Sequence, residues 1–237
     1  MNPYEKLMAR KRKWTPVQTT AGQVREGAEE TIYRALALRH MELPVGDFIN
    51  DALDSDVPLA SREILRSNVT DEENHDLALG YIANAYGTDD RAEAEAKRLR
   101  DAWVSHPDHT VLKAMVAERA IFFVLLPFFR FNGDAGMRTV SADISRDEQI
   151  HVATNSIVCR ELGLDISPSL DKLRKATINW VMQPLTNNSL KYLDKNFWLD
   201  SSDRLMYEGK APELVATKSA RMPAFFEHSN VNLPQYA

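Results

Sequence analysis

Two Glu-x-x-His steps carry the side chains of this sequence that are best suited to chemistry. They are Glu72 with His75 and Glu148 with His151. Because a helix turns by about 100° per residue, positions i and i+3 share one face, so each step directs a carboxylate and an imidazole the same way. Two such steps, with one further Glu from each of two other helices, form the ligand set of a carboxylate-bridged dimetal site in a helical bundle.

Both steps interrupt apolar stripes at helical spacing, and such stripes face the core of a helical protein. The stripe around Glu72 contains Leu65, Leu79 and Ile82, and the stripe around Glu148 contains Val140, Ile144 and Val158. A buried carboxylate is costly unless it is paired or bound to a metal. The two steps are therefore candidate metal ligands.

Glu118 is the candidate ligand from a third helix. Asn132-Gly133-Asp134 forms a short break between two helical patterns, which predicts that the flanking helices pack antiparallel. Glu118 lies fifteen residues before Gly133 and Glu148 lies fifteen after it, so the two should stand at the same height. Glu118 also falls in an apolar stripe. A metal ligand is the favoured interpretation, and a structural ion pair is the alternative.

Glu42 is the candidate ligand from a fourth helix. With Val57 as the midpoint of the connection, Glu42 lies fifteen residues before it and Glu72 fifteen after it. Part of this connection is expected not to be helical, so the symmetry is weaker evidence here. The competing residues are Glu29, Glu30 and His40.

The proposed site contains four carboxylates and two imidazoles, a donor set that suits iron or manganese. Its four negative charges balance two divalent cations and leave a low-dielectric core roughly neutral. The members are Glu42, Glu72, His75, Glu118, Glu148 and His151.

Composition sets the class of protein. The chain has 237 residues, few glycines and a net charge of −5, which favours an all-α domain without general attraction to nucleic acid. The single Cys159 excludes an internal disulfide and thiolate metal sites. The most apolar stretch, 120–129, is too short to span a membrane, and no signal peptide is evident, so a cytoplasmic setting is expected. The basic run 10–13 is interpreted as a solvated helix face.

Helix boundaries follow from caps and breakers. A first long helix is expected from Thr19 or Thr20 to about Leu43, where Pro44 should prevent continuation, followed by a connection over 45–57. Further helices are expected over 58–86, 90–104, 110–131, 135–162 and 168–196. The chain then divides into an N-terminal arm (1–18), a helical bundle with the dimetal site (19–196) and an irregular C-terminal segment (197–237).

Several of these motifs resemble a known family, the small, radical-generating subunit of class I ribonucleotide reductase. The segment Ile144–His151, ISRDEQIH, resembles the family's Ile-x-Arg-Asp-Glu-x-x-His signature. The segment Glu118–Phe123, ERAIFF, resembles its third ligand helix, and Trp14-Thr-Pro16 resembles its Trp-x-Pro. The order of the six candidate ligands agrees as well, and the resemblance covers about residues 14–160.

The resemblance implies a ferritin-like four-helix bundle with additional helices, usually dimeric, with a dinuclear Fe/Fe or Mn/Fe centre. It also implies an oxidising equivalent that passes to a cysteine in a separate large subunit, which converts ribonucleotides to deoxyribonucleotides. A hydrogen-bonded path from His75 through Asp147 to Trp14 is part of this expectation. The C-terminal tail is expected to dock on the large subunit, with Tyr236 as the tail tyrosine of the radical relay and Tyr207 as the alternative.

One position departs from the family. The radical-bearing Tyr usually follows the first ligand His by four residues, and here that residue is Leu79. Tyr81 points away from the His75 face, and Tyr86 lies three turns along the helix, at about 16 Å. Leucine cannot be oxidised to a useful radical, so the oxidant is expected on the metals, as in the subgroup with Phe at this position. The alternatives are a dimetal oxidase or oxygenase that acts on its own substrate, and an iron-storage protein.

Overall fold

The computed structural model describes residues 2–55 and 57–214, and in this part of the chain all regular structure is helical apart from an isolated bridge between Thr186 and Asp194. The all-α prediction is confirmed at this level. No helix among the described residues is long and apolar enough to cross a membrane. The helices are α1 (Pro3–Met8), α2 (Glu29–Ala37), α3 (Glu42–Leu53), α4 (Arg62–Tyr86), α5 (Asp90–Val104), α6 (Thr110–Ala117), α7 (Phe123–Asn132), α8 (Ala135–Glu161), α9 (Pro168–Met182) and α10 (Lys195–Glu208).

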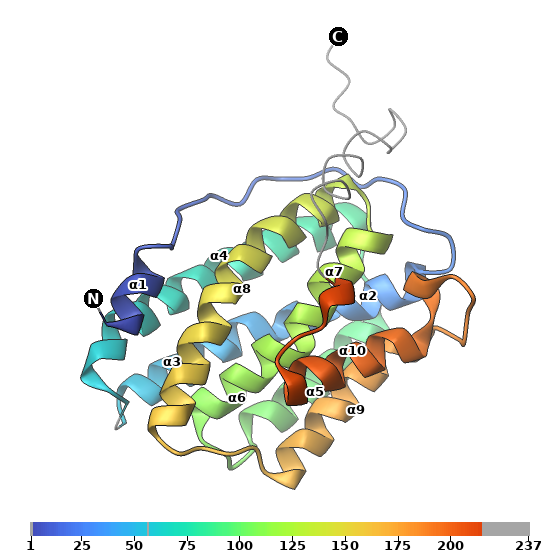
Figure 1. The fold of residues 1–237 in the computed structure, drawn as a ribbon. Coiled ribbons are helices and arrows are strands. Elements are labelled where there is room, and N and C mark those ends of the chain that lie inside the picture. The colour runs from blue at the N-terminus through green and yellow to red at the C-terminus, as the bar shows by residue number, and fades with distance from the viewer. Residues whose placement is uncertain (1, 56, 215–237) are drawn as a thin grey trace.

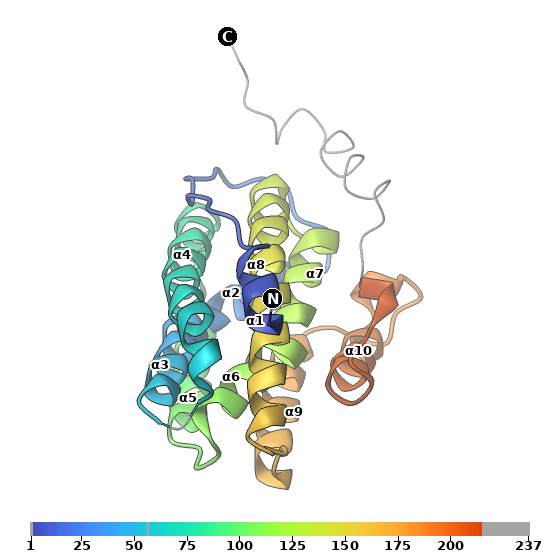
Figure 2. The ribbon, with the colours of Figure 1, turned by 60° about the vertical axis from the view of Figure 1, so that its left-hand side comes forward.

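Four helical rods surround the centre of the molecule (Figures 1 and 2). They are α3, α4, α8 and a rod made of α6 and α7 joined by a π-helix, Glu118–Phe122. α3 packs on α4 and α6, while α4, α6 and α7 each pack on α8. The interior is lined by apolar side chains such as Ile49, Leu65 and Val158, all buried.

Strong local signals place α4, α5 and α8 close to their predicted bounds. Asp89 caps α5 by accepting from the backbone N–H of Ala92, and Asp134 caps α8 by accepting from that of Met137. These carboxylates satisfy amide groups that the first turn of a helix leaves without partners. α4 ends at Gly87, whose φ of 100° continues no helix.

The expected helix over 19–43 is wrong for residues 19–28. The segment 9–28, which we call the N-terminal strap, has no regular structure, and α2 begins only at Glu29. Gly27 has a φ of 84°, a left-handed conformation that ends any helix passing through it. The strap is instead held by the α7–α8 turn, where Asp134 and Asn132 accept hydrogen bonds from the backbone N–H groups of Gly22 and Arg25.

The connection expected over 45–57 is also wrong, because α3 occupies most of it. Pro44 lies in the first turn of α3, where its missing N–H costs nothing because such groups have no partner within the helix. A short 3-10 helix, Leu38–Met41, links α2 to α3. Proline therefore marks the start of the helix here and not its end.

Near the C-terminus, the predicted helix over 168–196 is two helices separated by an irregular stretch. α9 stops at Met182 and α10 starts at Lys195, capped by Asp194. The prediction of irregular structure from residue 197 is thus wrong for 197–208. α10 packs on the π-helix and α9, a position that only the tertiary fold creates.

Candidate metal centre

The six predicted ligand residues meet at one buried place between α3, α4, α8 and the π-helix. Each is at most 2% exposed. Glu42 opens α3, Glu118 opens the π-helix, and the two Glu-x-x-His steps lie within α4 and α8. The members are Glu42, Glu72, His75, Glu118, Glu148 and His151.

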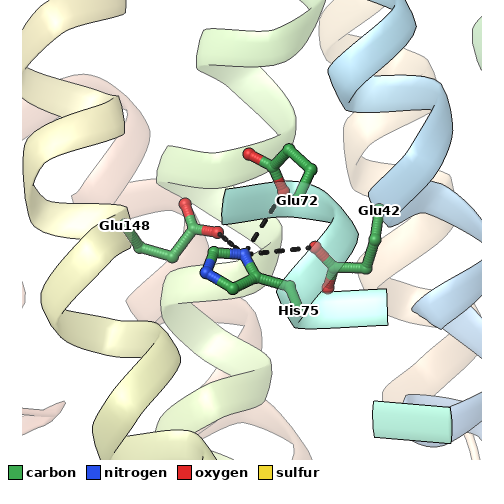
Figure 3. Close-up of side chains that lie close together, drawn as sticks. All are labelled: Glu42, Glu72, His75 and Glu148. Atoms are coloured by element: carbon green, nitrogen blue, oxygen red, sulfur yellow. Dashed lines mark ion pairs between the residues drawn. The ribbon is translucent and has the colours of Figure 1, made fainter. Parts of the chain in front are cut away.

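Three carboxylates surround Nδ1 of His75 (Figure 3). Oε2 of Glu72 and Oε1 of Glu148 each lie 3.3 Å from it, and Oε2 of Glu42 lies 3.7 Å away. The four side chains offer donor atoms within 4.8 Å of one another. They could therefore hold a metal ion.

Nδ1 of His151 faces a second group of carboxylates. Oε1 of Glu72 lies 2.9 Å from it, and Oε1 of Glu118 and Oε2 of Glu148 each lie 3.8 Å away. Glu72, Glu118 and His151 form a second set of donors within 4.8 Å. Glu72 and Glu148 thus direct one oxygen toward each imidazole, so both lie between the two groups.

The donor atoms that face the centre have no hydrogen-bond partner among the described residues. Such buried polar atoms are rare in folded proteins, and each requires an explanation. A cation at the centre would satisfy all of them at once. The atoms are Glu42 Oε2, both carboxylate oxygens of Glu72 and of Glu148, Glu118 Oε1, and Nδ1 of His75 and of His151.

The electrostatics of the cluster also indicate a site for cations. Desolvation raises the pKa of Glu42 to about 8, and it raises the pKa of Glu118 and Glu148 as well. Burial disfavours a charged imidazole, but the charges of Glu72 and other carboxylates outweigh it and raise the pKa of His151 to about 10. Without metal, protons therefore supply the positive charge that the carboxylates require.

The π-helix shapes the Glu118 side of the site. One-turn π-helices occur often at functional sites, because the wider turn moves a side chain out of α-helical register. Nδ2 of Asn155 donates to Oε2 of Glu118 at 2.7 Å, which leaves Oε1 to face His151. The sequence contained a signal for Asn155, since it lies one turn after His151 on the same helical face.

Each imidazole hydrogen-bonds on its outer side to an Asp of the opposite helix. Nε2 of His75 lies 3.4 Å from Oδ2 of Asp147, and Nε2 of His151 lies 3.0 Å from Oδ2 of Asp71. Trp14 Nε1 donates to the same Asp147 oxygen at 2.5 Å, so Trp14, Asp147 and His75 lie in the expected order. Asp71 was missed in the sequence, although Asp-Glu-x-x-His occurs twice.

Other candidates lie elsewhere. The exposed Glu29 and Glu30 accept hydrogen bonds from the nearby Gly27 and Arg34, and His40 contacts Glu93 of α5 at 2.5 Å. Leu79 is buried. Tyr207 is 57% exposed, and its hydroxyl donates to Asp171. Tyr236 lies outside the described residues.

The comparisons with known proteins add no family to this geometry. What the structure gives is a buried cluster of Glu and His residues that could hold a metal ion. No family model, no curated protein and no solved structure matches the chain.

Proposed function

We propose that this chain is the radical-generating small subunit of a class I ribonucleotide reductase, with a ferritin-like bundle and a dinuclear iron or manganese–iron centre. The observation that carries the proposal is the set of inward-facing donor atoms without partners, arranged in two groups that share Glu72. A plain structural ion-pair cluster would leave few such atoms, because buried charges are normally paired and hydrogen-bonded.

The donor set fits two divalent ions. Glu42 and His75 would hold one ion, Glu118 and His151 would hold the other, and Glu72 and Glu148, each of which directs one oxygen toward each imidazole, could contribute to both. Carboxylate oxygens and imidazole nitrogens suit iron and manganese. When bound, the ions would supply one-electron oxidising chemistry that the side chains of this protein cannot supply themselves.

Trp14 is the residue proposed to carry oxidising equivalents between the metal centre and the protein surface. Its ring lies over the imidazole of His75, with centroids 6.3 Å apart and planes inclined by 25°. Asp147 accepts from the indole N–H and also faces Nε2 of His75. Asp147 can therefore take the indole proton when the ring loses an electron, so that no charge is left uncompensated in a partly buried site.

Storage of the oxidant on the metals follows from Leu79. This buried residue lies one turn after His75 on α4, the position at which a tyrosyl radical would be formed in the family. Its aliphatic side chain cannot be oxidised under these conditions. With Leu79 at this position, the bound metals would have to store the oxidising equivalent, and Trp14 is the residue that could relay it.

A partner subunit is required by the chemistry. Ribonucleotide reduction needs cysteines for both the radical and the reducing electrons, and this chain has only Cys159, which is buried. We propose that a large subunit supplies them and binds the C-terminal tail, and that this chain forms a homodimer, as is usual for the family.

The decisive experiment combines metal analysis with electron paramagnetic resonance and a reductase assay. The purified chain is loaded anaerobically with Fe(II), alone or with Mn(II), exposed to oxygen and assayed with and without a class I large subunit. We expect two metal ions per chain, a metal-based signal and activity only with the partner. A stable tyrosyl signal would refute the role given to Leu79, and oxidation of a small substrate without the partner would favour an oxygenase.

Trp14→Phe tests the transfer path. We expect partner-dependent reductase activity to be lost while the metal content remains that of the unaltered protein, because phenylalanine is much harder to oxidise and has no N–H. Trp180→Phe is the matched control, since the Trp180 indole also donates to a carboxylate, Glu95, at 2.7 Å but lies on α9, which contributes no ligand. Equal activity of the two variants would exclude Trp14 from the path.

A further inference from the structure

The N-terminal strap touches the metal centre from outside at two points. Trp14 donates to Asp147, which faces His75, and Lys11 contacts Asp71, which faces His151. The two contacts lie three residues apart on the strap. Each imidazole of the cluster is therefore held by a carboxylate that the strap holds in turn.

Lys11 is bound far more closely than an ordinary surface lysine. Its side chain is only 9% exposed, and its ammonium lies 2.5 Å from Oδ2 of Asp71. It also donates to Oδ1 of Asn68 at 2.9 Å. Asn68 and Asp71 are one turn apart on α4, so each can direct one acceptor oxygen to this ammonium. The expectation that the basic run 10–13 forms a solvated helix face is therefore wrong, because the run is not helical and Lys11 is largely buried.

The Lys11 ammonium and the His151 imidazole contact the same oxygen of Asp71. Oδ2 of Asp71 is 3.0 Å from Nε2 of His151 and 2.5 Å from Nζ of Lys11. Asp71 is 12% exposed at its side chain, so without Lys11 it could turn toward water and release the imidazole. A carboxylate that binds the outer nitrogen of a ligand histidine fixes the ring's orientation and keeps the inner nitrogen available.

We propose that Lys11 is a positioning residue that, through Asp71, holds His151 in place for the metal ion on the Glu118 side of the centre. This inference rests on the proposed dimetal function. The surroundings of the two histidines then differ. Asp147, which contacts His75, accepts a hydrogen bond from a neutral indole, whereas Asp71, which contacts His151, forms an ion pair with a lysine. The strap must then be docked before the His151 position reaches its full affinity.

The test is a calorimetric titration of the metal-free full-length chain with Mn(II). Lys11→Met removes the ammonium and keeps the length of the side chain. We expect one binding step to weaken by about 10-fold, the lower end of the range for loss of the group hydrogen-bonded to a metal ligand, because Lys11 contacts that group and not the ligand itself. The other step should be unchanged. Lys11→Arg, which keeps the charge and can reach two acceptors, should restore most of the lost affinity.

Lys13→Met is the matched control for charge. Lys13 lies on the same strap and is exposed, and its side chain makes no ion pair or hydrogen bond with the residues that the structure describes, so both substitutions remove one positive charge from the same segment. Loss of a nearby cation alone would strengthen the binding of Mn(II). A weaker step in Lys11→Met than in Lys13→Met therefore reports the lost contact, and identical isotherms for the two variants would overturn the proposal.

Asp71→Asn shows whether Lys11 acts through Asp71. The amide keeps the shape of the side chain but loses the charge, so the same binding step should weaken. Adding Lys11→Met to Asp71→Asn should lower the Mn(II) affinity little further, because the effects of two residues are not additive when one acts through the other. If Lys11→Met does not fold by circular dichroism, Asp71→Asn and Lys11→Arg carry the test. Two unchanged steps in Asp71→Asn would contradict the proposal.

Failure of this inference can be separated from failure of the proposed function. If the unaltered chain binds no metal ion, the dimetal function itself is wrong. If it binds two ions and Lys11→Met binds them with the affinities of Lys13→Met, only the role of Lys11 is wrong.

Discussion

Two clusters of charged side chains in this molecule, each with a buried centre, have opposite characters. The first surrounds Arg174 on α9, which is fully buried and donates to Asp171, Ser202 and Asp203 at 2.7 to 2.9 Å. The second is the cluster of Glu and His residues between α3, α4, α8 and the π-helix, whose central atoms face one another without hydrogen bonds. Both lie inside the same helical protein.

The difference separates an ion-pair cluster whose hydrogen bonds are satisfied within the chain from a cluster of buried donors that could hold a metal ion. The hydrogen-bonding groups of Arg174 are satisfied, because its guanidinium donates to acceptors on α9 and α10. The Glu and His cluster is incomplete, because four carboxylates meet only two imidazoles. Burial of charge alone therefore does not identify a functional site, whereas several carboxylate and imidazole donors that face one another without hydrogen bonds make a candidate metal site.

The largest effect is expected from Glu148→Ala. Glu148 directs one oxygen to each half of the cluster, so its loss should abolish stoichiometric metal binding at both positions. The fold should persist, since the change removes a buried charge. Metal analysis together with circular dichroism checks this, and a variant that still holds two ions per chain would exclude Glu148 as a ligand.

Metal should stabilise the protein more than any single contact does. A ligand that binds only the folded state at a thousand times its dissociation constant adds about 4 kcal/mol to the free energy of unfolding. We therefore expect a clear rise in the denaturant midpoint on addition of Mn(II), reversed by a chelator. Glu148→Ala should show no such rise, and an equal rise in both proteins would indicate binding elsewhere.

Arg174→Met should lower the stability of the fold and leave metal binding unchanged, whereas Glu148→Ala should abolish metal binding and leave the fold intact. Loss of hydrogen bonds between charged groups is expected to lower the free energy of unfolding by about 2 kcal/mol, because the apolar chain leaves Ser202 and the two aspartates without their donor. The metal content should not change. Denaturant unfolding and metal analysis of the same sample test the two statements, and a fall in metal content would show that the clusters are coupled.

The smallest effect is the pH dependence of metal binding. In the metal-free protein at pH 7, His151, with a pKa of about 10, and Glu42, with a pKa of about 8, hold protons that a metal ion must displace. The affinity should therefore rise as the pH increases from 6 to 8 and fall on acidification. Calorimetry in buffers of different ionisation enthalpy should reveal released protons, and an affinity independent of pH would contradict these pKa values.

Parts of the fold were predictable because their signals are local. The Asp caps of α5 and α8 and the glycine after α4 determine helix ends within a few residues of chain, whatever the remainder does. The strap and α10 were not predictable in this way. Thr19 and Thr20 were predicted to cap a helix, yet their segment packs on the α7–α8 turn through hydrogen bonds to Asp134 and Asn132. These two residues lie more than a hundred positions away in the sequence.

Glu42 lies beside His75 as the sequence predicted, although the connection assumed in that prediction was wrong. Its expected height came from reflection about Val57 across a non-helical connection, but α3 in fact starts at Glu42 and runs through most of that connection. Glu42 still lies 3.7 Å from His75. The π-helix at Glu118 was likewise absent from the prediction, because an α-helical and a π-helical turn have the same apolar pattern over so few residues.

The sequence by itself determined the all-helical class, the long helices α4 and α8, and the donor types that one face of each helix presents, because helical spacing fixes which side chains share a face. Only the tertiary structure decided that Asp71 reaches across to His151 on the opposite helix, and that the strap brings Lys11 behind it. The path from His75 through Asp147 to Trp14 was expected from the family resemblance and from no local pattern. Those contacts join residues from distant parts of the chain, and their distances depend on how the rods pack and not on any local preference.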